Sequence, residues 1–196
     1  MSWRAWVCTL MSVVAVGCGR TNSPPVVIEP EAMGMLPNVP TDPFGTSSPA
    51  YERLVELTDA ARTTDWDGQA ESLAGWLEAQ TIAVEQSLAL MKALRVGPSD
   101  AYAVANGRIA LLYEHIAGTL TQAEAVVADD PTEYDWLGQE FALWERANGF
   151  WARCARGCSL EGPYLDVWEL RCEAGERETK SKVSEGIPVP SARQPK

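Results

Sequence analysis

The feature that most constrains the fold is a pair of long apolar stripes separated by Gly97-Pro98. The first stripe spans residues 66–91 and the second spans residues 102–127. Within each stripe the apolar side chains recur mostly at intervals of three, four or seven positions, which places them on one face of a helix. Because proline cannot continue a helix, the two stripes predict two long helices joined by a turn.

Two further helices are predicted on either side of this pair. Ser48 is followed by Pro49, a pairing typical of a helix start, and it predicts a helix over residues 49–63. Thr132-Asp135 resembles a capping box with aspartate in place of glutamate. A fourth helix is expected to follow it and to end near Gly157.

The C-terminal part of the chain has a less definite pattern. Residues 163–175 suit either a short helix or a strand, and helix is favoured because no partner strand is visible in the sequence. We therefore predict an all-α domain over residues 49–175, an antiparallel bundle of four helices plus a short C-terminal helix. Residues 176–196 are charged and then rich in proline and serine, so a disordered tail is expected there.

The N-terminus is organised like an export signal. Arg4 supplies positive charge, Val7–Val16 form an apolar run too short to span a bilayer, and small residues precede Cys18. This segment resembles the lipobox of bacterial lipoproteins, in which the cysteine is acylated and becomes the first mature residue. The resemblance implies that residues 1–17 are a signal peptide and that Cys18 carries two or three fatty acyl chains such as palmitate.

The same resemblance implies where the protein resides. Each acyl methylene buried in a bilayer contributes about 0.8 kcal/mol, so more than one chain makes the attachment stable. The expected location is the bacterial cell envelope, and Gly19 after the cysteine favours the outer membrane by analogy with enteric bacteria. The alternative interpretation is a buried N-terminal strand or helix in which Cys18 has no special role.

A proline-rich tether is expected between the acylated cysteine and the helical domain. Residues 19–48 contain six prolines, which remove backbone donors and exclude a lasting helix or a central strand. We interpret residues 18–48 as this tether. Two apolar segments within it, Val26–Ile28 and Met33–Leu36, leave open a second interpretation in which the tether docks on the domain or on a partner.

Three cysteines lie in the predicted domain, and they are candidates for a disulfide. Because their number is odd, a single bridge among Cys154, Cys158 and Cys172 leaves one of them as a free thiol. Cys154 and Cys158 are one helical turn apart, which is unfavourable for bridging. Cys158–Cys172 is the favoured pair, with Cys154–Cys172 as the alternative. A metal site or redox thiol is a weaker interpretation, because no second cysteine pair and no adjacent histidine accompany them.

Tryptophans form a second candidate site. Trp144 and Trp151 share one face of the predicted fourth helix, and Trp168 lies in the C-terminal segment. Aromatic side chains dominate both cores and interfaces, so two interpretations stand. The three indoles either fill the core or line a partly open aromatic groove for a peptide, a glycan or an apolar ligand.

The charge of the chain narrows the possible functions. It carries 16 Lys and Arg against 27 Asp and Glu, a net charge of -11, which disfavours nucleic acid as a partner. The C-terminal quarter is more basic than the rest. Its side chains Arg146, Arg153, Arg156 and Arg171 form either a solvated face or a site for an acidic partner or lipid head groups.

The sequence offers no pattern for catalysis. The chain has one histidine, and it has no phosphate-binding glycine loop, nucleophile elbow or paired metal-ligand motif. We therefore assign no catalytic residue, metal ligand or cofactor. The expected function is a noncatalytic interaction or scaffold domain, held to a membrane by acyl chains, with an envelope protein as its partner. The alternative is a periplasmic ligand carrier with an aromatic pocket between helices.

Overall fold

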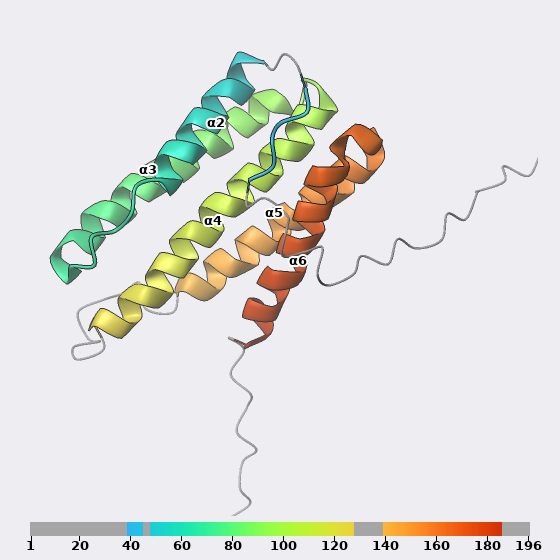
Figure 1. Ribbon diagram of the computed structural model, residues 1–196. Coiled ribbons are helices and arrows are strands. Elements are labelled where there is room, and N and C mark those ends of the chain that lie inside the picture. Colours follow the sequence, from blue (N-terminus) through green and yellow to red (C-terminus); the bar gives the residue numbers. More distant parts are fainter. Residues whose placement is uncertain (1–38, 45–47, 128–138, 186–196) are drawn as a thin grey trace, which may run out of the picture.

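The computed structural model describes residues 39–44, 48–127 and 139–185, and every regular element in these ranges is helical. Its helices pack as a bundle, which confirms the predicted all-α fold (Figure 1). Their bounds are α2 Pro49–Arg62, α3 Ala70–Leu94, α4 Ser99–Val127, α5 Gln139–Glu161, the short 3₁₀ helix η2 Pro163–Leu165, and α6 Asp166–Glu185. None of the described helices combines the length and apolarity needed to cross a bilayer.

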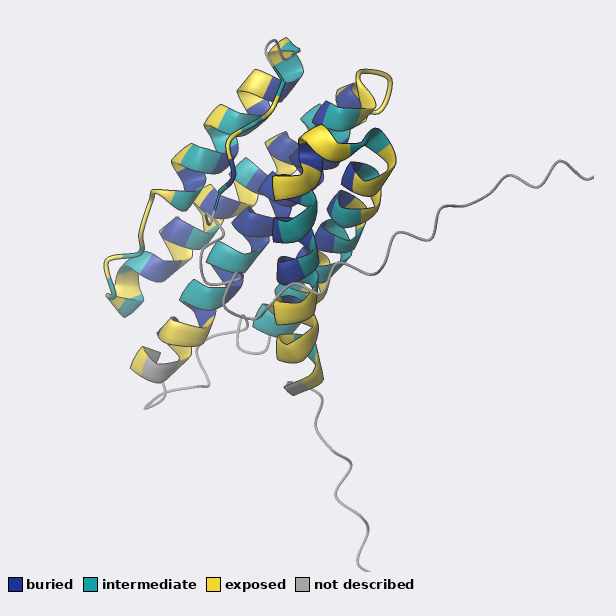
Figure 2. Ribbon diagram, turned by 45° about the vertical axis from the view of Figure 1, so that its right-hand side comes forward, coloured by how far each residue is buried: buried dark blue, intermediate teal, exposed yellow. Residues whose placement is uncertain are grey.

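Helix α4 lies at the centre of the bundle. It packs against α2 and α3 on one side and against α5 on the other, and α6 covers α5 (Figure 1). The residues of α4 between Ala101 and Tyr113 are buried, with Tyr102 alone half-buried. Most of this stretch is apolar or small, and its polar side chains Asn106 and Arg108 are buried as well, so neighbours can approach it from several directions. Figure 2 shows the buried faces turned inward and the exposed faces turned outward.

The pair α2 and α3 is joined by contacts around their connecting loop. The Ser48 side chain accepts a hydrogen bond from the Tyr51 backbone N–H, which confirms the predicted start of α2. At the other end of this helix, the Trp76 indole donates to the Thr64 carbonyl at 2.8 Å, and the Gln80 amide donates to the Ala61 carbonyl at 3.0 Å. These bonds satisfy carbonyls at the end of α2 that the helix leaves open.

The α5–α6 hairpin turns at Gly162, whose φ of 109° favours glycine over any residue with a Cβ. The sequence predicted that the fourth helix would end near Gly157, but α5 continues to Glu161. Gly157 lies inside the helix because its backbone packs against Ala103 of α4, where a Cβ would overlap. The glycine therefore serves close helix packing. The predicted start of this helix, Thr132-Asp135, lies outside the described residues.

The sequence analysis placed the start of the disordered tail too early, at residue 176. Helix α6 runs ten residues further, to Glu185, so it is not short and the boundary at 175 was wrong. The physical reason is a contact between helices: Thr179 is buried, and its hydroxyl accepts a hydrogen bond from the Asn148 amide at 3.0 Å. Residues 186–196 lie outside the described part of the chain.

The last described part of the expected tether belongs to the folded domain. Residues 39–44 lie along the bundle, and Val39 and Phe44 pack against its core. The Phe44 ring meets Tyr51 edge-on, with ring centroids 5.0 Å apart. The domain therefore begins before residue 49. The expected signal peptide, Cys18 and the rest of the tether lie outside the described residues.

Candidate functional site

A hollow between α3 and α5, with α4 as its floor, continues along the surface of α5, where every lining residue belongs to α5. One hollow of about 370 Å³ and a neighbouring one of about 430 Å³ share Phe150 and Arg153, and we call the two together the α3–α5 groove. The first is lined by Leu88, Met91, Lys92, Arg95, Tyr102, Asn106, Phe150 and Arg153. The second is lined by Ala142, Glu145, Arg146, Gly149, Phe150 and Arg153.

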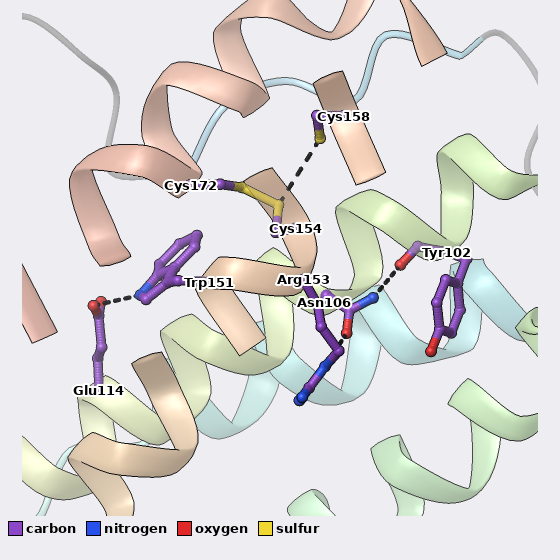
Figure 3. Close-up of a disulfide and its surroundings, with 8 residues drawn as sticks. All are labelled: Tyr102, Asn106, Glu114, Trp151, Arg153, Cys154, Cys158 and Cys172. Carbon is purple, nitrogen blue, oxygen red and sulfur yellow. Dashed lines mark hydrogen bonds between the residues drawn. A yellow bond between two sulfur atoms is a disulfide. The ribbon is translucent and has the colours of Figure 1, made fainter. Parts of the chain in front are cut away.

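The orientation of Arg153 is set by neutral groups. Its Nε donates to the Oδ1 of Asn106 at 3.2 Å (Figure 3). Its guanidinium lies over the Phe150 ring, 4.1 Å from the centroid. Asn106 is fully buried, and its amide donates to the Tyr102 carbonyl at 2.7 Å. The buried amide and the ring together hold the exposed guanidinium in one place, and neither cancels its charge.

Two further cations lie on the α3 side of the groove. Lys92 and Arg95 are exposed, and the Nε of Arg95 donates to the Tyr102 hydroxyl at 3.4 Å. The ion pairs within the described residues include neither of them, nor Arg153. With Arg146 in the second hollow, the groove therefore combines four cations with two aromatic rings and apolar side chains of α3, on a protein whose net charge is -11. This arrangement can bind an anion.

The buried cation Arg108 is already neutralised. It forms an ion pair with Asp42 at 2.9 Å and with Asp59 at 3.3 Å, and its Nε donates to the Tyr51 hydroxyl at 3.1 Å. Its guanidinium lies 5.7 Å from the centroid of the Trp168 ring. Burial raises the pKa of Tyr51 well above its ordinary value. This network joins residues 39–44 to α2 and α4, so its role is structural.

A second buried network joins α4, α5 and α6. Glu114 accepts a hydrogen bond from the Trp151 indole at 2.6 Å (Figure 3). It also forms an ion pair with Arg171 at 3.4 Å. Arg171 lies over the Trp151 ring, 4.4 Å from the centroid. Burial raises the pKa of Glu114 above its ordinary value, although both partners favour the ionised form.

The aromatic groove proposed from the sequence does not form. Trp151 and Trp168 are 0% and 1% exposed, so they belong to the core, which was the favoured of the two interpretations from the sequence. Trp144 is half-buried and does not line the α3–α5 groove. The physical reason is that α6 covers the face of α5 that carries Trp151. The aromatic residues of the groove are Tyr102 and Phe150 instead.

The disulfide joins Cys154 to Cys172, with Cα atoms 5.7 Å apart, and the favoured pair Cys158–Cys172 was wrong (Figure 3). The reason is helix register. Cys154 and Cys172 are equidistant in sequence from Pro163, at the hairpin turn, whereas Cys158 is level with Trp168. Because α5 continues past Cys158, this residue stays in the helix at the level of Trp168, and Cys154, one turn earlier, is the residue that pairs with Cys172.

Cys158 is the free thiol beside this disulfide. It is buried, and its Sγ lies 3.9 Å from that of Cys154. Burial raises the pKa of Cys158 to about 12, which disfavours the reactive thiolate. The three sulfur atoms lie within 4.8 Å of one another, as metal ligands would. With two of them joined in a disulfide, the cluster offers one thiol rather than three thiolates.

The arginines grouped in the sequence separate in the structure. Arg171 is buried against Glu114, Arg156 is exposed outside the groove, and Arg146 and Arg153 line it. The sequence analysis missed Lys92 and Arg95, which complete the groove from another helix. One signal could have found them. Gly97-Pro98 ends α3, so cations in its last turn lie next to the start of α4.

The described fold and groove define a class of protein, an all-α bundle domain with a cationic, partly aromatic groove on its surface. No protein-family model, no curated protein and no solved structure matches the chain. The interpretation of its function therefore depends on its own residues.

Proposed function

We propose that the protein is a lipid-anchored, noncatalytic interaction module of the bacterial cell envelope, and that its helical domain binds a partner through the α3–α5 groove. The anchor is Cys18, acylated after removal of residues 1–17, and the proline-rich chain that follows gives the domain reach from the membrane surface. The outer membrane is the favoured location.

One observation carries the binding role. Arg153, Arg95 and Lys92 face a groove of fixed shape without an ion-pair partner among the described residues. Arginine and tyrosine are enriched at the energetic centres of protein interfaces, and Tyr102 lies between the cations. A partner that supplied the missing negative charge would gain from side chains that are already oriented.

The noncatalytic part of the proposal draws on the buried charges. Arg108 and Glu114, the charged groups at the centre of α4, are both engaged in joining helices. The alternative function, a carrier with an aromatic pocket, has less support, because Trp151 and Trp168 are core residues. The α3–α5 groove is an open channel on the surface, which suits a partner surface better than an enclosed ligand.

Site-specific photocrosslinking in intact cells tests this function. A photoreactive benzoylphenylalanine at Tyr102 lies in the groove, and the same residue at Lys180, exposed on α6, is the matched control. We expect an adduct with one envelope protein from position 102 and none from position 180, and a weaker adduct when Cys18→Ser removes the anchor. Equal adducts from both positions, or none from position 102, would contradict the proposal.

A further inference from the structure

We propose that the occupant of the α3–α5 groove is an acidic peptide segment of the partner, with carboxylates at the groove edges and apolar side chains on its floor. This inference rests on the proposed function and adds the chemistry of the partner. It follows from how charge and apolar surface are distributed along the groove.

The cations lie on the two edges of the groove. Lys92 and Arg95 belong to α3, and Arg146 and Arg153 belong to α5. Among the lining residues the single carboxylate is Glu145. Positive charge on both edges attracts an anion that lies lengthwise in the groove, and it repels a cationic partner.

The floor between these edges is apolar and aromatic. Leu88 of α3 and Phe150 of α5 are half-buried, so each presents apolar surface to an occupant, while Met91 is buried. A small inorganic anion would use the charges and leave this surface in contact with water. A ligand that carries both carboxylates and apolar groups would cover it, and each square ångström of apolar surface removed from water contributes about 25 cal/mol.

The length of the groove favours a chain over a small molecule. Between the two helices the α3 lining residues run from Leu88 to Arg95, about 10 Å at 1.5 Å per residue, and along α5 the lining continues from Ala142 to Arg153, about 17 Å. An extended peptide rises about 3.3 Å per residue, so about five residues fill the span along α5. Alternation along such a peptide places every second side chain on the floor and the others toward the rim.

Arg153 is prepared for a carboxylate. Its Nε is occupied by Asn106 and its plane is stacked on Phe150, so the two terminal nitrogens are presented as a fork. A carboxylate accepts two parallel hydrogen bonds from such a fork. Arg108 shows within the fold that a guanidinium of this domain binds carboxylates through its terminal nitrogens, one nitrogen to Asp59 and the other to Asp42.

The charge of the whole protein argues against an anionic lipid surface as the occupant. A net charge of -11 is repelled by a bilayer that exposes acidic head groups, and four local cations do not reverse this repulsion at the range of a membrane. A single peptide chain enters the groove without bringing an extended negative surface with it. The observations therefore favour a peptide.

Fluorescence anisotropy on the intact lipoprotein in nonionic detergent tests the inference. The probe is a short fluorescein-labelled peptide of alternating glutamate and leucine, and the control probe has glutamine in place of each glutamate. We expect saturable binding of the acidic probe, weaker binding as salt rises, and about tenfold or greater loss for the neutral probe. Equal binding of both probes would overturn the proposal.

Matched variants locate the binding site. Arg153→Glu should weaken binding of the acidic probe by about tenfold or more, and Arg156→Glu, the same change one turn away on α5 but outside the groove, should leave it unchanged. Lys92→Glu on α3 should weaken binding of the acidic probe in the same way. A loss in both variants is then not explained by a folding defect in one of them. Equal effects of Arg153→Glu and Arg156→Glu would overturn the groove assignment.

A vesicle experiment separates a peptide from a lipid. Because acyl chains alone hold the lipoprotein to any vesicle, the comparison uses protein with Cys18→Ser: sedimentation with vesicles of phosphatidylglycerol and phosphatidylcholine should show the same association with and without Arg153→Glu. Association that is lost with Arg153→Glu, together with no binding of the acidic probe, would assign the groove to lipid head groups and overturn this inference. An adduct at Tyr102 without probe binding would overturn the partner chemistry and leave the proposed function standing.

Discussion

The indole of Trp151 packs directly on the backbone of Gly175, where a side chain would have its Cβ inside the ring. This contact sets how closely α6 approaches α5. It also places the indole N–H against Glu114 of α4, so three helices meet at one residue (Figure 3). The fully buried indole is therefore held by packing on one side and by a hydrogen bond on another.

Substitution of Gly175 tests this close approach. Gly175→Ala should lower the free energy of unfolding by about 1–3 kcal/mol, because the methyl group forces α6 away from Trp151. Gly75→Ala is the control, since no atom lies within 4 Å of a Cβ at that position on α3. It should raise stability by about 0.5–1 kcal/mol. Urea unfolding measures both, and equal effects of the two variants would refute the packing.

Substitutions of Glu114 give a second test of the contact that Trp151 makes between α4, α5 and α6. Glu114→Ala leaves the Trp151 indole without its acceptor and removes a counterion of Arg171, which should cost about 2–3 kcal/mol. Glu114→Gln keeps an acceptor oxygen and should cost about 1 kcal/mol. Thermal and urea unfolding compare the two variants. Equal losses for the two variants would mean that the charge of Glu114, and not the hydrogen bond to Trp151, dominates.

Helix ends that depend on nearby residues could be predicted, whereas those that depend on another helix could not. Pro49 and Gly97-Pro98 act within a few residues, and the predicted boundaries at both places are confirmed. The end of α6 was missed because the sequence after Gly175 is polar. The one deeply buried side chain in that part of α6 is Thr179, which accepts a hydrogen bond from Asn148 of α5. The same limit explains the wrong cysteine pair, because helix register is a tertiary property.

The disulfide can be tested by removing each cysteine in turn. Cys172→Ser should lower the free energy of unfolding by about 2–4 kcal/mol, because the cross-link no longer restricts the unfolded chain. Cys158→Ala should cost less than about 1 kcal/mol, since the bridge survives. Digestion of acid-quenched protein without reduction should yield a peptide that joins Cys154 to Cys172. A peptide that joins Cys158 to Cys172 would contradict the structure.

The burial of His115 predicts how the stability of the fold depends on pH. Burial lowers its pKa below the ordinary 6.5, and its ring meets Trp76 with centroids 5.7 Å apart. As pH falls through 6.5, the unfolded chain therefore takes up a proton that the folded chain does not, and this group makes folding less stable. It is the chain's one histidine, so a single imidazole signal in an NMR titration reports it. A pKa at or above 6.5 would refute the buried environment.

The α3–α5 groove could not be read from the sequence for a related reason. Arg153 and Lys92 are far apart in the chain, and the sequence analysis grouped arginines by their nearness in sequence. Their convergence depends on where α3 and α5 cross α4. The buried amide of Asn106, which orients Arg153, carries no sequence signal of its own. The sequence shows how many aromatic residues the chain has, but it does not show which of their rings the fold leaves exposed.

The central claim is that this helical domain works while tethered to a membrane through Cys18. The most direct measurement is metabolic labelling with radioactive palmitate, followed by membrane fractionation and mass spectrometry of the N-terminal peptide. We predict label on the wild-type protein, a mature chain that begins at acylated Cys18, and neither of these in Cys18→Ser. A wild-type protein without lipid on Cys18 would contradict the account.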